Sequence, residues 1–117
     1  MPGLKVQQGQ IWWARLPQLS GAETSQRHPV LVVQSDAFNR STLQTVVCIA
    51  LTNNWRLAKA PGNVLLSQSD TGLPKATVAN VAQIITVDKR FLIEYVSSIP
   101  SWLLESVLDG IQLLLGR

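Results

Sequence analysis

The sequence has few of the residues that build metal, redox and disulfide sites. Its 117 residues include one cysteine, Cys48, and one histidine, His28. A single cysteine cannot form an internal disulfide, and no cluster of cysteine, histidine and carboxylate ligands suits zinc. We therefore expect a protein without a metal or other cofactor in a reducing cytoplasm. Because Cys48 stands in the apolar run 46–51, we expect it to fill the core rather than act as a nucleophile.

Long hydrophobic runs are absent as well. A helix that spans a bilayer needs about 20 consecutive apolar residues. The apolar stretch near the end of the chain, around residues 111–115, is interrupted by Gln112. Residues 1–10 contain Lys5 but no apolar segment after it, so we expect no secretory signal. These features predict a cytoplasmic protein with no membrane partner.

Charged residues make up only 15% of the chain, against 46% hydrophobic residues. This balance, without repeats or linkers, predicts one compact domain over residues 1–117. The net charge of +3 is a mild excess. Most basic residues between positions 15 and 75 fall in expected loops, where they either form a surface for phosphate or are ordinary solvated charges. The basic residues in this range are Arg15, Arg27, Arg40, Arg56, Lys59 and Lys75.

Short apolar runs separated by polar residues, glycine and proline dominate most of the chain. Runs of this length that are rich in Val, Ile and Trp are typical of packed β-strands. We expect a small antiparallel barrel or sandwich with strands at 10–15, 29–34, 45–51, 63–67, 77–81, 83–87 and 92–96. The intervening segments 16–28, 35–44 and 52–62 are predicted loops. The first is long for a compact domain, so we expect it to be functional.

The end of the chain changes from strand to helix period. Ser101 is the expected N-cap and Gly116 the expected end of an amphipathic helix. Gly110 inside it costs about 1 kcal/mol relative to alanine, so we expect another backbone to approach there, from this chain or from a dimer partner. One stripe of the helix contains Leu103, Leu104, Val107, Leu108, Ile111, Leu114 and Leu115.

No common catalytic motif is present. The sequence lacks a glycine-rich phosphate loop, a Gly-x-Ser-x-Gly elbow and a His-Glu-x-x-His pair. His28 stands at the end of the first long loop, with Arg27 beside it and Glu23 upstream. A histidine at such a junction is most often a polar surface residue. An imidazole near a carboxylate and a guanidinium also suits acid/base catalysis.

Several segments together resemble the MazF/PemK family of toxins. Residues 9–13 (GQIWW) are similar to its first strand, and 21–23 (GAE) followed by 27–34 (RHPVLVVQ) to its Gly-x-Glu loop and Arg-Pro-Val strand. The match continues in order through residues 35–39, 50–52, 63–66, 72–73 and 83–88. It therefore covers nearly the whole chain.

This resemblance implies a PemK/CcdB-like fold, which is an SH3-like barrel with a terminal helix. It also implies a homodimer that cleaves single-stranded RNA in its grooves, and a cognate antitoxin whose acidic tail blocks them. In this family the ribose 2′-hydroxyl attacks the adjacent phosphate without a metal. The products carry a 2′,3′-cyclic phosphate and a 5′-hydroxyl.

The family's catalytic positions transfer with one departure. Its loop glutamate corresponds to Glu23 and its threonine at the end of the third strand to Thr52, but its arginine before the proline corresponds to His28. Either Arg27 reaches into the site in place of that arginine, or His28 exchanges the protons itself. We expect His28, Arg27, Thr52 and Glu23 to form the catalytic set.

RNA contacts are expected in two places. Asn53, Trp55 and Arg56 follow Thr52 in a polar loop, where the Trp55 ring either stacks on an unpaired base or folds back over the barrel. Lys75 either contacts a phosphate or is a solvated surface residue.

Two further departures keep other functions open. Some family members carry a catalytic arginine and aspartate where this chain has Asn80 and Ala82. A non-catalytic toxin of the same fold that binds DNA gyrase, as CcdB does, is one alternative. A family member that binds RNA or an antitoxin without cleaving is the other.

Overall fold

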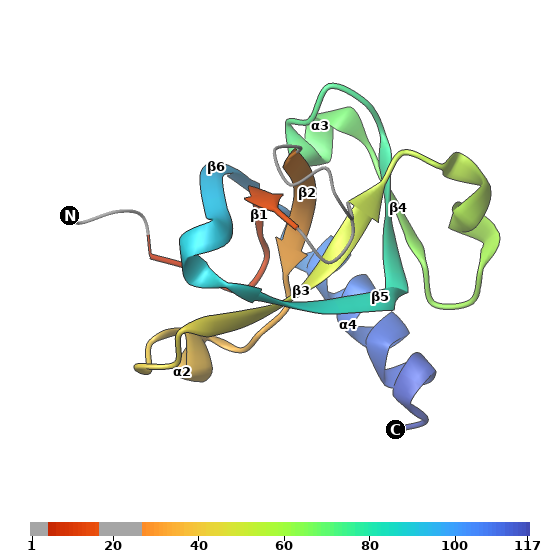
Figure 1. The fold of residues 1–117 in the computed structure, drawn as a ribbon. Helices are drawn as coiled ribbons and strands as arrows, with labels where there is room; N and C mark the ends of the chain where they lie inside the picture. Colours follow the sequence, from red (N-terminus) through yellow and green to blue (C-terminus); the bar gives the residue numbers. More distant parts are fainter. Residues whose placement is uncertain (1–4, 17–26) are drawn as a thin grey trace.

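A computed structural model of the chain describes residues 5–16 and 27–117. Within these ranges six strands form one sheet in the order β4-β5-β3-β2-β1-β6, and all neighbours are antiparallel (Figure 1). The sheet curls into a half-barrel with β4 and β6 at its edges. The strands are β1 (Gln10–Arg15), β2 (Arg27–Val32), β3 (Thr45–Thr52), β4 (Val64–Leu66), β5 (Thr77–Asp88) and β6 (Leu92–Ser98).

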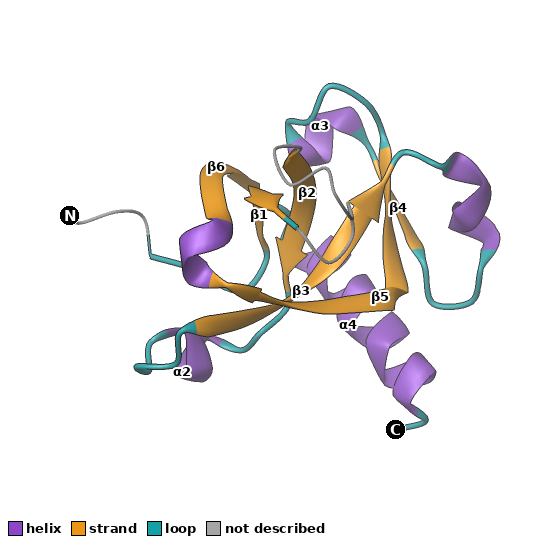
Figure 2. Ribbon diagram, viewed as in Figure 1, coloured by secondary structure: helices purple, strands orange, loops and turns teal. Residues whose placement is uncertain are grey.

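Short helices lie between the strands, and two of them, α2 (Asp36–Asn39) and the 3₁₀ helix η1 (Trp55–Lys59), occupy segments that the sequence analysis predicted as loops. Figure 2 shows α2 at one end of the molecule and η1 at the other. The helix α3 (Gln68–Thr71) precedes β5, and the 3₁₀ helix η2 (Lys89–Phe91) joins β5 to β6. Elements of three to five residues are too short to show a hydrophobic period, which is why the sequence did not predict them.

The sheet is buried on both faces. One hydrophobic cluster includes Leu31 and Ile49 together with Val107 of the C-terminal helix α4 (Ser101–Leu115). The other cluster includes Val30 and Cys48. Since successive strand residues point to opposite faces, both faces need apolar residues. This explains why these strands are continuous apolar runs without polar alternation.

Two strand predictions need correction. The predicted strands 77–81 and 83–87 are one strand, β5, with a bulge where residues 80–83 stand opposite Ala50 alone. The exposed Ala82 in this bulge interrupts the apolar pattern without ending the strand. The strand predicted at 29–34 begins earlier, at Arg27, so His28 lies within β2 and not before it. The other strand bounds agree within two residues.

The C-terminal helix is confirmed, with two differences. Its N-cap is Pro100 and not Ser101, which is the first helical residue. Gly116 ends the helix with φ of +75° and donates its N–H to Leu113 O, as expected for a glycine C-cap. Leu114 and Leu115 are exposed although they belong to the predicted stripe. Figure 1 shows that the last turn of α4 extends past the sheet, so nothing in the sheet covers these side chains.

Gly110 contacts a backbone of the same chain. A Cβ placed on Gly110 would lie 2.1 Å from the carbonyl oxygen of Gly62, in the turn before β4. A Cβ on Gly62 would in turn lie 3.0 Å from Gly110 O. The close approach that the sequence predicted is therefore intramolecular, and it brings α4 against the segment that leads into β4.

Replacing Gly110 with alanine is expected to destabilise the protein by roughly 2 kcal/mol, because the overlap with Gly62 O outweighs the gain in helix propensity. The free energy of unfolding in urea measures this. Ser106→Ala, at an exposed position of the same helix, is the matched control and should change stability by less than about 0.5 kcal/mol. Equal stability of the two variants would show that the two backbones are not in contact.

Candidate active site

A pocket of about 380 Å³ opens where β1, β2 and β3 meet the loop that leads into β5. It combines apolar side chains with a small number of polar ones. The residues around it are Trp13, His28, Pro29, Leu51, Thr52, Asn53, Leu73, Pro74, Lys75 and Thr77. Four of the predicted site residues, His28, Thr52, Asn53 and Lys75, thus share one pocket although the sequence separates them widely.

The pairing of β2 with β3 brings His28 to Thr52. Val30 pairs with Ala50 at the end of this ladder, so His28 and Thr52 each lie two residues beyond the last pair, at the same end of the two strands. His28 is half-buried, and its Nε2 is buried with no hydrogen-bond partner among the described residues. Thr52 Oγ1 accepts the N–H of Asn54 at 3.1 Å, which leaves its own O–H free to donate. A ring nitrogen without a partner and a hydroxyl with an unused proton therefore belong to residues of the same pocket.

Arg27 lies beside the pocket but does not line it. Its Nη1 donates to Glu94 Oε1 of β6 at 2.9 Å, and its guanidinium lies 4.9 Å from the centre of the Trp13 ring. Trp13 lines the pocket, whereas Arg27 does not. Of the two alternatives that the sequence left open, this geometry favours His28 as the group that faces a substrate. Glu23 lies outside the described residues.

The polar loop after β3 forms η1, and its tryptophan is exposed. The Trp55 side chain is 68% exposed, and the Arg56 guanidinium lies 5.7 Å from its ring centre. Asn54 caps η1 by accepting the N–H of Arg56 at 3.2 Å. The ring does not fold back over the sheet. Neither Trp55 nor Arg56 lines the pocket, but both follow directly on Thr52 and Asn53, which do.

Lys75 lies on a turn that the fold holds in place. The helix α3 ends at Gly72, whose φ of +77° suits glycine, and Thr71 Oγ1 accepts the N–H of Leu73 at 3.0 Å. Leu73 is buried in the cluster under α4. The exposed Lys75 makes no ion pair within the described part of the chain, so its ammonium group is available at the pocket rim.

The sequence analysis missed three contributors to this site. Trp13 and Thr77 were placed only as residues of expected strands, and Glu94 was not singled out. Thr77 is 5% exposed, and its Oγ1 has no partner among the residues that the structure describes. A threonine at the start of an apolar run is the only signal that the sequence offers for it.

Asn80 and Ala82, the two further departures that the sequence analysis noted, are not among the residues that line the pocket. They belong to the bulge of β5, where Asn63 donates to Asn80 Oδ1 at 3.3 Å. Asn63 also donates to Leu57 O and accepts the N–H of Val81. This network ties η1 to β5, which gives Asn80 a structural contact in place of a catalytic one.

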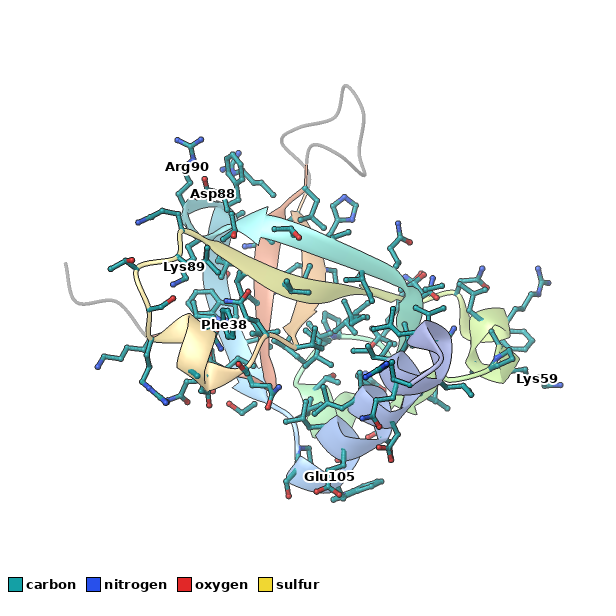
Figure 3. The ribbon with its side chains drawn as sticks, turned by 90° about the horizontal axis from the view of Figure 1, so that it is seen from below. Phe38, Lys59, Asp88, Lys89, Arg90 and Glu105 are labelled. Atoms are coloured by element: carbon teal, nitrogen blue, oxygen red, sulfur yellow. The ribbon has the colours of Figure 1, made fainter. Side chains whose placement is uncertain are left out.

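The basic residues do not form one face. Figure 3 shows Lys59 at the outer end of η1, at the opposite end of the molecule from Asp88 and Arg90. Arg40 follows α2, which is also far from η1, and Arg27 is paired with Glu94. Among the six basic residues that the sequence analysis considered for a phosphate-binding surface, Lys75 is the one that lines the pocket. The positions of Arg40 and Lys59 agree with ordinary solvated charge.

Cys48 is buried, and burial raises the pKa of its thiol to about 12. The group is therefore a neutral thiol at physiological pH, which agrees with core filling.

We expect iodoacetamide to modify native Cys48 on the order of 10³-fold more slowly than the urea-unfolded chain at the same pH, because the thiolate fraction falls tenfold per pKa unit. Mass spectrometry against time measures both rates. Equally fast modification of the native protein would show that the thiol is accessible and ionised.

The fold is that of known RNA-cleaving toxins. It matches an endoribonuclease in complex with its cognate antitoxin from a mycobacterial species, with a TM-score of 0.76, 25% identity and coverage of 95% of both chains. It also matches MazF from Deinococcus radiodurans, with a TM-score of 0.75, 24% identity and coverage of 98% of this chain and 100% of that one.

Sequence similarity to known proteins identifies the family. Residues 7–115 match the model of the PemK-like, MazF-like toxins of type II toxin-antitoxin systems, and the chain belongs to this family. Endoribonuclease MazF6 of Mycobacterium tuberculosis is 40% identical over 107 residues, which cover 92% of this chain and 94% of the relative. Endoribonuclease EndoA of Bacillus subtilis is 29% identical over 111 residues, 95% of each. The predicted family and the mainly β fold with a C-terminal helix are confirmed.

Proposed function

We propose that this chain is the toxin of a type II toxin-antitoxin pair and cleaves single-stranded RNA without a metal. One observation carries the proposal: His28 and Thr52 face one pocket, and the buried His28 Nε2 has no partner in the described residues. Such an unpaired nitrogen is ready to exchange a proton with a bound substrate. The curated relatives of this chain are endoribonucleases, which agrees with this chemistry.

In the proposed reaction His28 Nε2 takes the proton from a ribose 2′-hydroxyl. The 2′-oxygen then bonds to the adjacent phosphorus, and the bond from phosphorus to the 5′-oxygen breaks. The protonated His28 returns a proton to the leaving 5′-oxygen, so the products are a 2′,3′-cyclic phosphate and a 5′-hydroxyl. The Thr52 hydroxyl donates to a phosphate oxygen, and the Lys75 ammonium stabilises the charge that develops there.

The strand of RNA is proposed to continue over η1. An exposed indole with a guanidinium beside it, as in Trp55 and Arg56, suits stacking on an unpaired base. Asn53, on the pocket rim between Thr52 and η1, is placed to hydrogen-bond the intervening nucleotide. Single-stranded RNA can follow this path because its bases are free to turn toward the protein.

We also propose a cytoplasmic homodimer that a cognate antitoxin inhibits. A solved structure of similar fold holds its own antitoxin, which supports a partner of this kind. No helix among the described residues is long and apolar enough to cross a membrane.

Purified protein is expected to cut a long single-stranded RNA in EDTA and to leave 5′-hydroxyl ends, which end mapping detects. His28→Ala should lower the rate on the order of 10²-fold or more, because the proton acceptor is lost. Thr52→Val should cost about tenfold through one hydrogen bond. Arg40→Gln, far from the pocket, is the control and should cut at the parental rate. Intact RNA would favour a gyrase-binding or non-cleaving toxin, and a parental rate in His28→Ala would refute the assignment of His28.

The roles of His28 and Arg27 are separable by paired variants. We expect His28→Gln to lose far more activity than Arg27→Gln, since Arg27 is engaged with Glu94 and Trp13. Single-turnover cleavage rates measure the difference. Glu94→Gln tests the ion pair from the other side and should leave the rate within a few-fold of the parent. A larger loss in Arg27→Gln than in His28→Gln would assign the catalytic role to the arginine.

A further inference from the structure

Thr77 has a buried hydroxyl that the fold does not use. It is the first residue of β5, it is 5% exposed, and its Oγ1 has no hydrogen-bond partner in the described part of the chain. A buried polar group without a partner is destabilising, and folded proteins pair the great majority of such groups. Thr77 is one of the residues that line the pocket, together with His28. Its missing partner is therefore expected to be something that enters this pocket.

A second threonine nearby shows that the fold can satisfy such a group. Thr71 is fully buried, and its Oγ1 accepts the N–H of Leu73 at 3.0 Å. Thr71 thus has a structural role in the turn that leads to Lys75. Thr77 has the same side chain and similar burial but no such bond, and Thr71, unlike Thr77, is not among the residues that line the pocket.

The surroundings of Thr77 suit a base better than a phosphate. Trp13, Pro29, Leu51, Leu73 and Pro74 give the pocket an apolar lining, and its one cation is Lys75. Pockets of this kind take flat apolar ligands and use a few polar groups to fix their orientation. Phosphate binding relies instead on charged donors. A volume of about 380 Å³ admits an unpaired nucleotide and excludes a duplex.

We propose that Thr77 determines base specificity, with its hydroxyl hydrogen-bonded to the edge of a nucleobase inserted into this pocket. This inference rests on the proposed RNA cleavage and names a residue that selects the substrate. The base stacks against the apolar lining while the ribose and phosphate of the bound strand face His28, Thr52 and Lys75. A hydroxyl is both donor and acceptor, so the bond discriminates between bases by the group that each presents at that edge.

The test compares Thr77→Val with Thr71→Val in a pool of RNAs randomised around the cleavage site. Thr77→Val is expected to lower kcat/KM at the parental sites by about tenfold and to relax the base preference at one position. Its thermal midpoint should stay the same or rise, because no internal bond is lost. Thr71→Val should lower the midpoint and keep the parental preference. Thr77→Ser should restore the preference, since it keeps the hydroxyl.

Two results would overturn the inference. One is a Thr77→Val protein with the parental rate and base preference. The other is a loss of activity that follows a lowered midpoint and that Thr77→Ser does not repair, because this describes a structural residue.

Failure of the proposed function has a different signature. If the parental protein leaves every RNA intact, cleavage is refuted, and fluorescence anisotropy with RNAs that differ at one base decides the role of Thr77. Base-selective binding that Thr77→Val abolishes would support it, and equal affinities of both proteins for all the RNAs would refute it.

Discussion

The register between β2 and β3 is the constraint on which the site depends. The pairing of Val30 with Ala50 brings together the strand ends that carry His28 and Thr52, and a slip of one residue would exchange every side chain between the two buried faces of the sheet. Because both faces carry packed clusters, such a slip would bury mismatched side chains throughout the sheet. The same packing that stabilises the fold thereby fixes the distance between the proposed proton acceptor and the hydroxyl donor.

The pocket concentrates the groups that folding leaves unsatisfied. Within the described residues, His28 Nε2 and Thr77 Oγ1 are the buried side-chain atoms without a hydrogen bond, and both belong to residues that line it. Elsewhere the fold pairs its buried polar groups closely. Gln34 and Asn39, for example, bond to each other and to backbone atoms. Each of these two unpaired atoms lowers the stability of the folded chain. Because both belong to residues of one pocket, we infer that a bound ligand supplies their missing hydrogen bonds.

The sequence predicted the sheet well because burial on both faces leaves continuous apolar runs. It divided β5 in two because Ala82 and its neighbours at the bulge break the pattern, and no local signal distinguishes a bulge from a turn. His28 and Thr52 were singled out because they stand at the positions of the family motif, and both line the pocket. The ion pair of Arg27 with Glu94 joins residues 67 positions apart, and the unpaired hydroxyl of Thr77 exists only in the folded chain. The spacing of residues along the sequence carries no information on this ion pair or on this hydroxyl.

The distribution of charge bears on how RNA is held. Arg27 is neutralised by Glu94, Arg40 and Lys59 lie toward opposite ends of the molecule, and Lys75 is the cation that lines the pocket. Few phosphate contacts release few counterions, so electrostatics supplies only part of the affinity, and its dependence on salt is shallow. In the proposed binding mode the remainder comes from stacking on Trp55 and from burial of a base against Trp13 and Leu73. These contacts require unpaired bases, so the sparse charge around the pocket and the proposed preference for single strands have a common physical origin.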